Sequence, residues 1–148
     1  GPEEYQFQAL LVPLRIKEVL KGDVKAGDLI DFYEISFFSK AATGQVTYFD
    51  VSPFNPMQPG REYIVFAKKI IFHPAYQARL ERDVYRAVSL EASYFLPEIT
   101  EPPILDESET IYFQNVKENE FNCYSKEQRD AINRVKKEIL SRLNLPTA

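Results

Sequence analysis

The side chains that could carry out chemistry are few and far apart. The chain has one histidine, His73, and one cysteine, Cys123, fifty residues further on. A zinc site needs three or four histidine, cysteine or carboxylate ligands, and a nucleophilic cysteine needs a neighbouring base or cation. The sequence therefore predicts no zinc site, no catalytic cysteine–histidine pair and no internal disulfide. We expect Cys123 to be a small buried side chain, and its reactivity stays open.

Carboxylates are the other candidate group, because the chain contains 22 aspartate and glutamate residues. The densest run is "DESE", from Asp106 to Glu109, and calcium prefers several carboxylate oxygens. The run has neither the spacing nor the glycine of an EF-hand loop, so a solvated connector is favoured over a calcium site. Elsewhere the acids are too many to single out a catalytic pair, and there is no "G-x-S-x-G" motif. We predict no catalytic residue, no cofactor and no metal site, and hence no enzyme.

Two of the five glycines, Gly22 and Gly27, lie close together in "VLKGDVKAGDLIDF". A phosphate-binding loop would need closely grouped glycines that open a helix after a strand. Here Gly27 precedes the alternating stretch "LIDFYEI", which is typical of a strand. The two glycines therefore predict the turn of a hairpin, with Gly27 exposed and at positive φ.

Alternation of apolar and polar residues predicts a protein made mainly of β-strands. The first strand, from Phe7 to Leu20, is expected to bend or bulge at Pro13, because proline cannot donate to a strand ladder. In the next strand Ile30 and Phe32 share one face. The remaining strands are predicted at 45–51, 62–70 and 83–97, with a short edge strand at 110–116.

The chain is expected to end in a helix over about residues 126–143. Ser125 followed three residues later by Gln128 is a capping box. The predicted buried face carries apolar residues at helical spacing: Ala131, Ile132, Val135, Ile139 and Leu143. The basic run "RVKK", residues 134–137, is predicted to be a solvated face. An acidic, proline-rich connector is predicted over 97–109, and residues 72–83 are compatible with a loop or one helical turn.

Length and charge limit the classes of partner. At 148 residues the chain fits one domain, and its formal net charge of −4 counts against a nucleic-acid partner. No apolar run approaches the ~20 residues of a membrane span. The chain starts at Gly1 without an initiator methionine, as after removal of a purification tag. A signal peptide or anchor of the natural protein is then expected to have been removed as well.

Five strands in order, a bent first strand and a late helix are typical of a five- to six-stranded Greek-key OB-like barrel. The barrel is expected over about residues 5–96 of a single domain that spans 1–148. In addition, "VLKGDVKAGDLIDF" followed by "QPGREYIVFAKK" resembles the pattern of netrin-like domains, the family that includes the tissue inhibitors of metalloproteinases. The resemblance covers roughly residues 7–70. It implies a cysteine-poor, secreted or envelope-associated microbial protein. The chain departs from the inhibitors at its amino terminus, where Gly1 stands in place of the cysteine that chelates zinc.

The function expected from these observations is that of a noncatalytic extracytoplasmic binding module with an unidentified protein or ligand partner. The candidate contact residues are Phe54 and Met57, which lie in the proline-stiffened loop "SPFNPMQP". The alternative is that both side chains fold back onto the core. Two alternative functions are a protease inhibitor that uses exposed loops and an OB domain that binds single-stranded nucleic acid.

Overall fold

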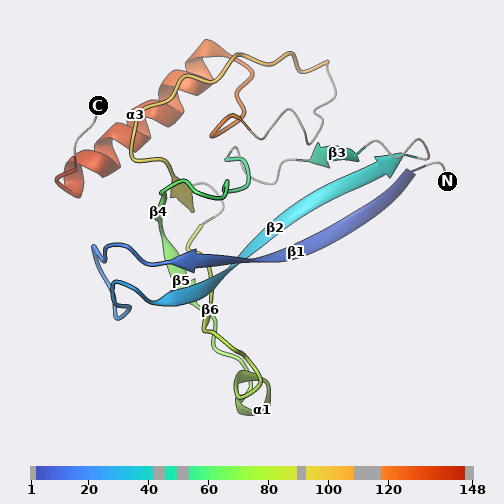
Figure 1. Cartoon of the computed structure of the whole chain (residues 1–148). Coiled ribbons are helices and arrows are strands. Elements are labelled where there is room, and N and C mark those ends of the chain that lie inside the picture. The colour runs from blue at the N-terminus through green and yellow to red at the C-terminus, as the bar shows by residue number, and fades with distance from the viewer. Residues whose placement is uncertain (1–2, 42–45, 50–53, 90–92, 109–117, 146–148) are drawn as a thin grey trace.

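The computed structural model describes residues 3–41, 46–49, 54–89, 93–108 and 118–145 (Figure 1). The described chain is mainly sheet, with one long helix near the C-terminus. Strands β1 (Glu3–Arg15) and β2 (Leu29–Ala41) form a long antiparallel hairpin. Gly22 and Gly27 lie in the connection at φ values of 120° and 93°. Both glycines are exposed, which confirms the predicted turn.

The bulge that was one of the two expectations at Pro13 is wrong. The β1–β2 register runs without a bulge from Glu3 opposite Ala41 to Arg15 opposite Leu29. Asp31, the residue opposite Pro13, donates its N–H to the carbonyl oxygen of Asp83 at 3.0 Å, on the side away from β1. The pair is therefore one in which the backbone groups point away from each other. The backbone nitrogen of Pro13 therefore faces away from β2, at the free edge of the sheet. A missing N–H there removes no hydrogen bond between strands.

The other strands are short. Strand β3 (Val46–Phe49) pairs with β2, strand β6 (Val84–Ala87) pairs with β2 in parallel, and strand β5 (Ala67–Lys69) pairs with β6. Strands β4 (Ile64–Val65) and β7 (Tyr94–Phe95) form a separate two-stranded sheet. The main sheet has the order β1-β2-β6-β5, so the described strands do not close into a barrel. The predicted edge strand at 110–116 lies outside the described residues.

The predicted strands 62–70 and 83–97 are each divided in two. The division falls at Phe66, whose N–H donates to Ser93 at 2.8 Å and whose carbonyl accepts from Val88 at 3.1 Å. The chain therefore leaves the small sheet and joins the main sheet at this residue. Residues 72–83, which connect the 62–70 segment to the 83–97 segment, include one helical turn, α1 (Pro74–Gln77).

The core is aromatic. Its fully and nearly buried members are Phe32, Phe54, Tyr94, Phe95, Phe121, Cys123 and Leu140. Ile30 and Phe32 both point inward, as their alternation predicts, and Glu34 shares their buried face. Tyr94 is central, because its ring makes edge-on contacts with Phe32 and Tyr63 at centroid distances of 6.0 and 5.9 Å.

Helix α3 (Lys126–Arg142) begins at the predicted cap and ends one residue before the predicted end. Ser125 Oγ accepts from the N–H of Gln128 at 3.0 Å, and Gln128 Oε1 accepts from the N–H of Tyr124 at 2.7 Å. The predicted buried face is confirmed for Ile132 and Ile139, which pack against the core, and is wrong for Ala131 and Val135, which are exposed. The buried residues of α3 are Asn133, Lys136 and Leu140, whereas Val135 is 54% exposed.

The difference between the predicted and observed buried faces of α3 follows from a buried ion pair that the sequence pattern does not predict. The ammonium group of Lys136 donates to both carboxylate oxygens of Glu120, at 2.6 Å to Oε2, and both side chains are 1% exposed. The ammonium also lies 5.9 Å from the centre of the Phe95 ring. Lys136 therefore contradicts the prediction that "RVKK" is a solvated face, although Arg134 and Lys137 are exposed.

We predict that Lys136→Met lowers the free energy of unfolding by about 3–5 kcal/mol, because the substitution leaves the Glu120 carboxylate buried without its counter-charge. Urea denaturation measures the loss. The matched control is Lys137→Met, at the exposed neighbouring lysine, which should change the value by no more than about 0.5 kcal/mol. Equal effects of the two substitutions would contradict the structural role of the ion pair.

Candidate functional site

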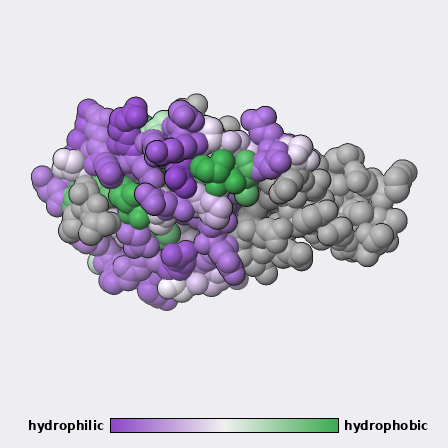
Figure 2. Space-filling model, turned by 90° about the horizontal axis from the view of Figure 1, so that it is seen from above, coloured by the Kyte–Doolittle hydropathy of each residue, from purple (hydrophilic) through white to green (hydrophobic). Residues whose placement is uncertain are grey.

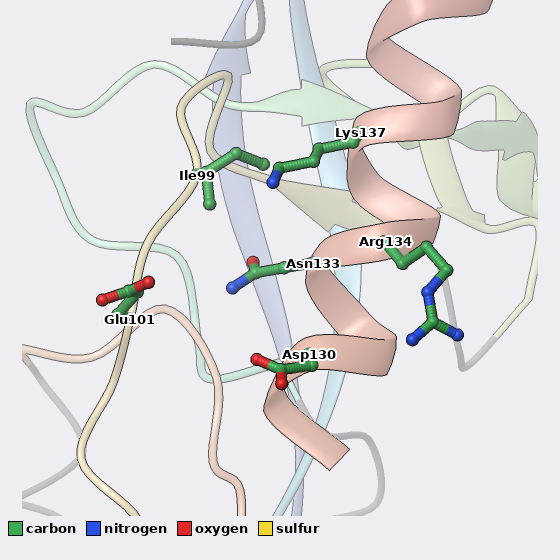
Figure 3. Close-up of a pocket in the computed structure, with 6 residues that line it drawn as sticks. All are labelled: Ile99, Glu101, Asp130, Asn133, Arg134 and Lys137. Carbon is green, nitrogen blue, oxygen red and sulfur yellow. The ribbon is translucent and has the colours of Figure 1, made fainter. Parts of the chain in front are cut away.

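A groove runs between α3 and the extended segment 99–101 (Figure 3). Its volume is about 270 Å³, and its lining residues are Ile99, Glu101, Asp130, Asn133, Arg134 and Lys137. Among the coloured residues, the surface seen from above, the side on which α3 lies in Figure 1, is mainly hydrophilic and has separate hydrophobic patches (Figure 2). The small volume and the charged lining of the groove suit it to a small ligand with polar groups.

The helical side of the groove is a line of three side chains. Asp130, Asn133 and Lys137 are spaced i, i+3 and i+7, so they share one stripe of α3. Asn133 and Lys137 extend toward the segment 99–101, and Arg134 points away from it (Figure 3). At 1.5 Å per residue, Asp130 and Lys137 are about 10 Å apart along the helix axis. The stripe thus has an acidic end, an amide centre and a basic end.

The amide centre is incompletely satisfied. Asn133 is 7% exposed, and its Nδ2 donates to the carbonyl oxygen of Thr100 at 2.8 Å. This bond fixes the orientation of the amide, because the reversed amide would bring two oxygens together. The Oδ1 atom has no hydrogen-bond partner, alone among buried side-chain polar atoms in the described part of the chain. An unmatched buried acceptor costs about 1–3 kcal/mol.

The charges at the rim of the groove have no described counter-charge. Glu101, Asp130 and Lys137 are all exposed. Within the described ranges none of the three makes an ion pair, although other charged residues do. These charges are therefore available to a ligand that carries both signs.

The Glu120 carboxylate joins the two sides of the groove through its hydrogen bonds. Besides the two bonds from Lys136, this carboxylate accepts from the N–H of Leu96 at 3.2 Å and from Thr100 Oγ1 at 3.3 Å. Burial raises the pKa of Glu120, and Lys136 offsets part of that rise. Burial also lowers the pKa of Lys136. One carboxylate thus fixes the segment 99–101 relative to α3.

The predicted contact residues Phe54 and Met57 lie elsewhere, since neither lines the groove. Phe54 is 6% exposed, and its ring centre lies 5.9 Å from that of Phe121. Met57 is half-buried and packs against the same core. The geometry favours the alternative that both side chains fold back, and a contact role for them stays a prediction.

The loop that carries these two residues is attached by amides. The Asn55 and Asn122 side chains exchange two hydrogen bonds, at 3.1 and 2.9 Å. The N–H of Asn55 also donates to the carbonyl oxygen of Glu120 at 2.9 Å. A loop with these fixed, buried partners has little freedom to adapt to a binding partner.

Glu34 is the second buried carboxyl group. The Tyr94 hydroxyl lies 2.6 Å from Glu34 Oε1 and 2.8 Å from the carbonyl oxygen of Asn55. Burial raises the pKa of Glu34, and bonds from Tyr94 and the backbone of Met57 offset part of the rise. Tyr94 has a single hydroxyl proton, so a protonated Glu34 that donates to it satisfies both neighbours. A raised carboxyl pKa is also a property of catalytic acids, but Glu34 does not line the groove.

The remaining candidates for chemistry are not assembled. Cys123 is fully buried, with its Sγ 3.6 Å from the Pro103 carbonyl oxygen, and burial raises the pKa of the thiol. The buried position confirms the expectation for this residue. His73 is exposed and caps α1, accepting from the N–H of Ala75 at 3.2 Å. The two side chains therefore face different surroundings and form no pair.

The "DESE" run contains a local turn. Asp106 Oδ1 accepts from the N–H and the hydroxyl of Ser108, at 2.9 and 2.7 Å, and these bonds lower the pKa of Asp106. Glu109 lies outside the described residues. Across the residues that are described, no three histidine, cysteine or carboxylate groups come together as a metal site.

Comparison of the chain with protein-family models, with curated proteins and with solved structures finds no match in any of the three. Among the described helices, none has both the length and the apolar character needed to cross a membrane. The candidate site therefore has to be interpreted from its own geometry.

Sequence reasoning missed the groove. Asn133 and Lys136 interrupt the apolar pattern of α3 with polar residues at i and i+3. That interruption is the one available signal, since polar residues on a helix face that must be buried require partners. The partners, Thr100 and Glu120, come from segments for which the sequence predicted no role.

We predict that the melting temperature of Glu34→Gln rises relative to the wild type as the pH increases from about 4 to 8. The folded pKa of Glu34 lies above its unfolded value of about 4.3, so its stabilising contribution is complete below that pH and is lost as the pH rises through the folded pKa. Glutamine mimics the neutral acid at every pH. The exposed Glu81→Gln is the control, and a difference that is flat with pH for Glu34→Gln would contradict the prediction.

For the loop residues, we predict that Phe54→Ala lowers the free energy of unfolding by about 3–5 kcal/mol, the usual cost of truncating a buried phenylalanine. Met57→Ala should cost less, because Met57 is only half-buried. Chemical denaturation of both variants tests the difference. Unchanged stability together with loss of partner capture would instead identify these side chains as a contact surface.

Proposed function

We propose that the protein is a noncatalytic binding module and that the groove beside α3 binds a small polar ligand. The observation that carries this proposal is the unpartnered Oδ1 of Asn133, buried at a groove whose rim charges are unpaired. A bound donor would remove the cost of the unmatched acceptor. The unmatched acceptor destabilises the free protein, so a ligand that donates to Oδ1 would gain binding free energy by removing this penalty.

The groove is a better candidate than the loop 54–58. A binding surface needs polar groups that are accessible and unmatched, or apolar groups that are exposed. Phe54 and Asn55 are buried and have partners within the core. The groove residues Glu101, Asp130 and Lys137 are exposed and unpaired within the described chain.

The noncatalytic part of the proposal is supported by the lining of the groove. The lining side chains are two carboxylates, two cations, one amide and one isoleucine. Neither His73 nor Cys123 is among these lining residues, and each carboxylate and cation is exposed at the rim. Binding needs only what the groove contains.

The finer structural and cellular interpretations remain proposals. A netrin-like barrel is supported by the hairpin with Gly22 and Gly27 in its connection and by the sequence resemblance. A secreted or envelope-associated location and a protease-inhibitor function are supported by that resemblance alone. Nucleic-acid binding gains no support from the side chains that are described, because Phe32 lies in the core.

Nuclear magnetic resonance of the uniformly ¹⁵N-labelled full chain tests the proposed function. The probe is a panel of glycine, triglycine, succinate, putrescine and glucose, each added to 10 mM. We expect at least one compound to shift the backbone amides of residues 99–101 and 130–137. No shift in these two segments with any compound would overturn the proposed site.

Two charge-matched double variants provide the control. Asp130→Asn with Lys137→Gln removes both ends of the stripe, and we expect it to weaken binding of any charged compound. Lys126→Gln with Glu127→Gln makes the same change in charge at exposed positions in the first turn of α3, outside the groove. Equal weakening by both variants would show that binding does not depend on the charges that line the groove.

A further inference from the structure

Resting on the proposed function, we infer that the ligand of the groove is a short peptide with both termini free, about three residues long. Its ammonium group would lie at the end formed by Glu101 and Asp130, and its carboxylate at Lys137. An internal peptide N–H would donate to Oδ1 of Asn133.

The order of charges along the groove supports a ligand with two poles. Glu101 and Asp130 provide two carboxylates at one end, and Lys137 provides an ammonium group at the other (Figure 3). The second lining cation, Arg134, points away from the segment 99–101. A dianion would be repelled at the acidic end, and a diamine would be repelled at the basic end. A ligand that carries one charge of each sign is complementary to both ends.

The distance between the poles selects the size of the ligand. Asp130 and Lys137 are about 10 Å apart along the helix axis. An extended peptide spans about 3.3–3.6 Å per residue, so three residues cover this length. In a single amino acid the two charges are separated by far less and cannot contact both ends. The volume of about 270 Å³ also limits the ligand to a small one.

The centre of the groove distinguishes a peptide from other bipolar molecules. The only buried side-chain polar atom without a partner in the described structure is an acceptor, Oδ1 of Asn133, midway along the stripe. A peptide offers an N–H group at this position, whereas an aliphatic amino acid of the same length offers only methylene groups. The inferred ligand therefore satisfies both rim charges and the amide.

The closing experiment is a titration with triglycine, followed at the amides of Asn133 and Lys137 and at the Asn133 side-chain amide. We expect a dissociation constant on the order of 1 mM, the value that usual ligand efficiency gives for a molecule of this size. N-acetyl-triglycine, triglycine amide and 8-aminooctanoic acid are the comparison probes. Each should bind at least about threefold more weakly than triglycine, because each lacks one of the three contacts.

Single variants assign each contact to its residue. Asp130→Asn should reduce the preference for triglycine over its N-acetyl form, and Lys137→Gln should reduce the preference for triglycine over its amide. Both substitutions are at exposed positions, so we expect both variants to fold. Thermal melting of each variant verifies this. An unchanged preference in both variants would overturn the assigned orientation.

The outcomes separate this inference from the proposed function. If triglycine causes no shift but glycine, succinate, putrescine or glucose does, the peptide inference is wrong and the binding groove stands. If no compound causes a shift in residues 99–101 or 130–137, both fail. If triglycine and 8-aminooctanoic acid bind equally, no peptide N–H donates to Asn133 Oδ1, and the inference of a peptide ligand is wrong.

Discussion

The ion pair between Glu120 and Lys136 is the constraint on which the arrangement of the chain's C-terminal half depends. Two charges at 1% exposure are stable only if nearly all their hydrogen-bonding capacity is used. The Glu120 carboxylate meets this condition through bonds from Lys136, the Leu96 N–H and the Thr100 hydroxyl. These donors come from α3, from the residue after β7 and from the segment beyond it. One carboxylate therefore sets the rotation of α3 and the position of its neighbouring segment together, which generic apolar packing would leave less defined.

The rest of the core repeats this use of directional polar contacts among aromatic rings. The paired amides of Asn55 and Asn122 join the loop after β3 to the segment before α3. Tyr94 packs its ring among Phe32, Phe54 and Tyr63 while its hydroxyl contacts Glu34. Apolar packing tolerates small slides, whereas a buried hydrogen bond with one geometry does not. These contacts add to the short ladder of β7, which contains Tyr94 and has only two residues.

The sequence predicted the features that are determined by neighbouring residues. The glycine turn, the start of α3 at Ser125 and the inward face of Ile30 and Phe32 each follow from a local rule, namely positive φ, helix capping and period-two alternation. Prediction failed where a distant partner decides. The division of the 62–70 strand at Phe66 depends on Ser93 and Val88. The rotation of α3 depends on Glu120, because an unpaired lysine would be placed in solvent. The groove was unpredictable for the same reason, since it is the space that this rotation leaves.

The rotation of α3 also explains why Asn133 is left with an unmatched acceptor. Residues three apart on a helix lie on the same side, so burying Lys136 draws Asn133 toward the margin of the buried face. There the Thr100 carbonyl accepts the amide N–H, and no described donor reaches Oδ1. An apolar residue of similar size would avoid the unmatched acceptor at this margin but would lose the bond to Thr100. The asparagine therefore both attaches the segment 99–101 and presents an acceptor at a groove with charges of both signs. A site of this kind offers a ligand charged groups of both signs and an amide acceptor beside the apolar side chain of Ile99.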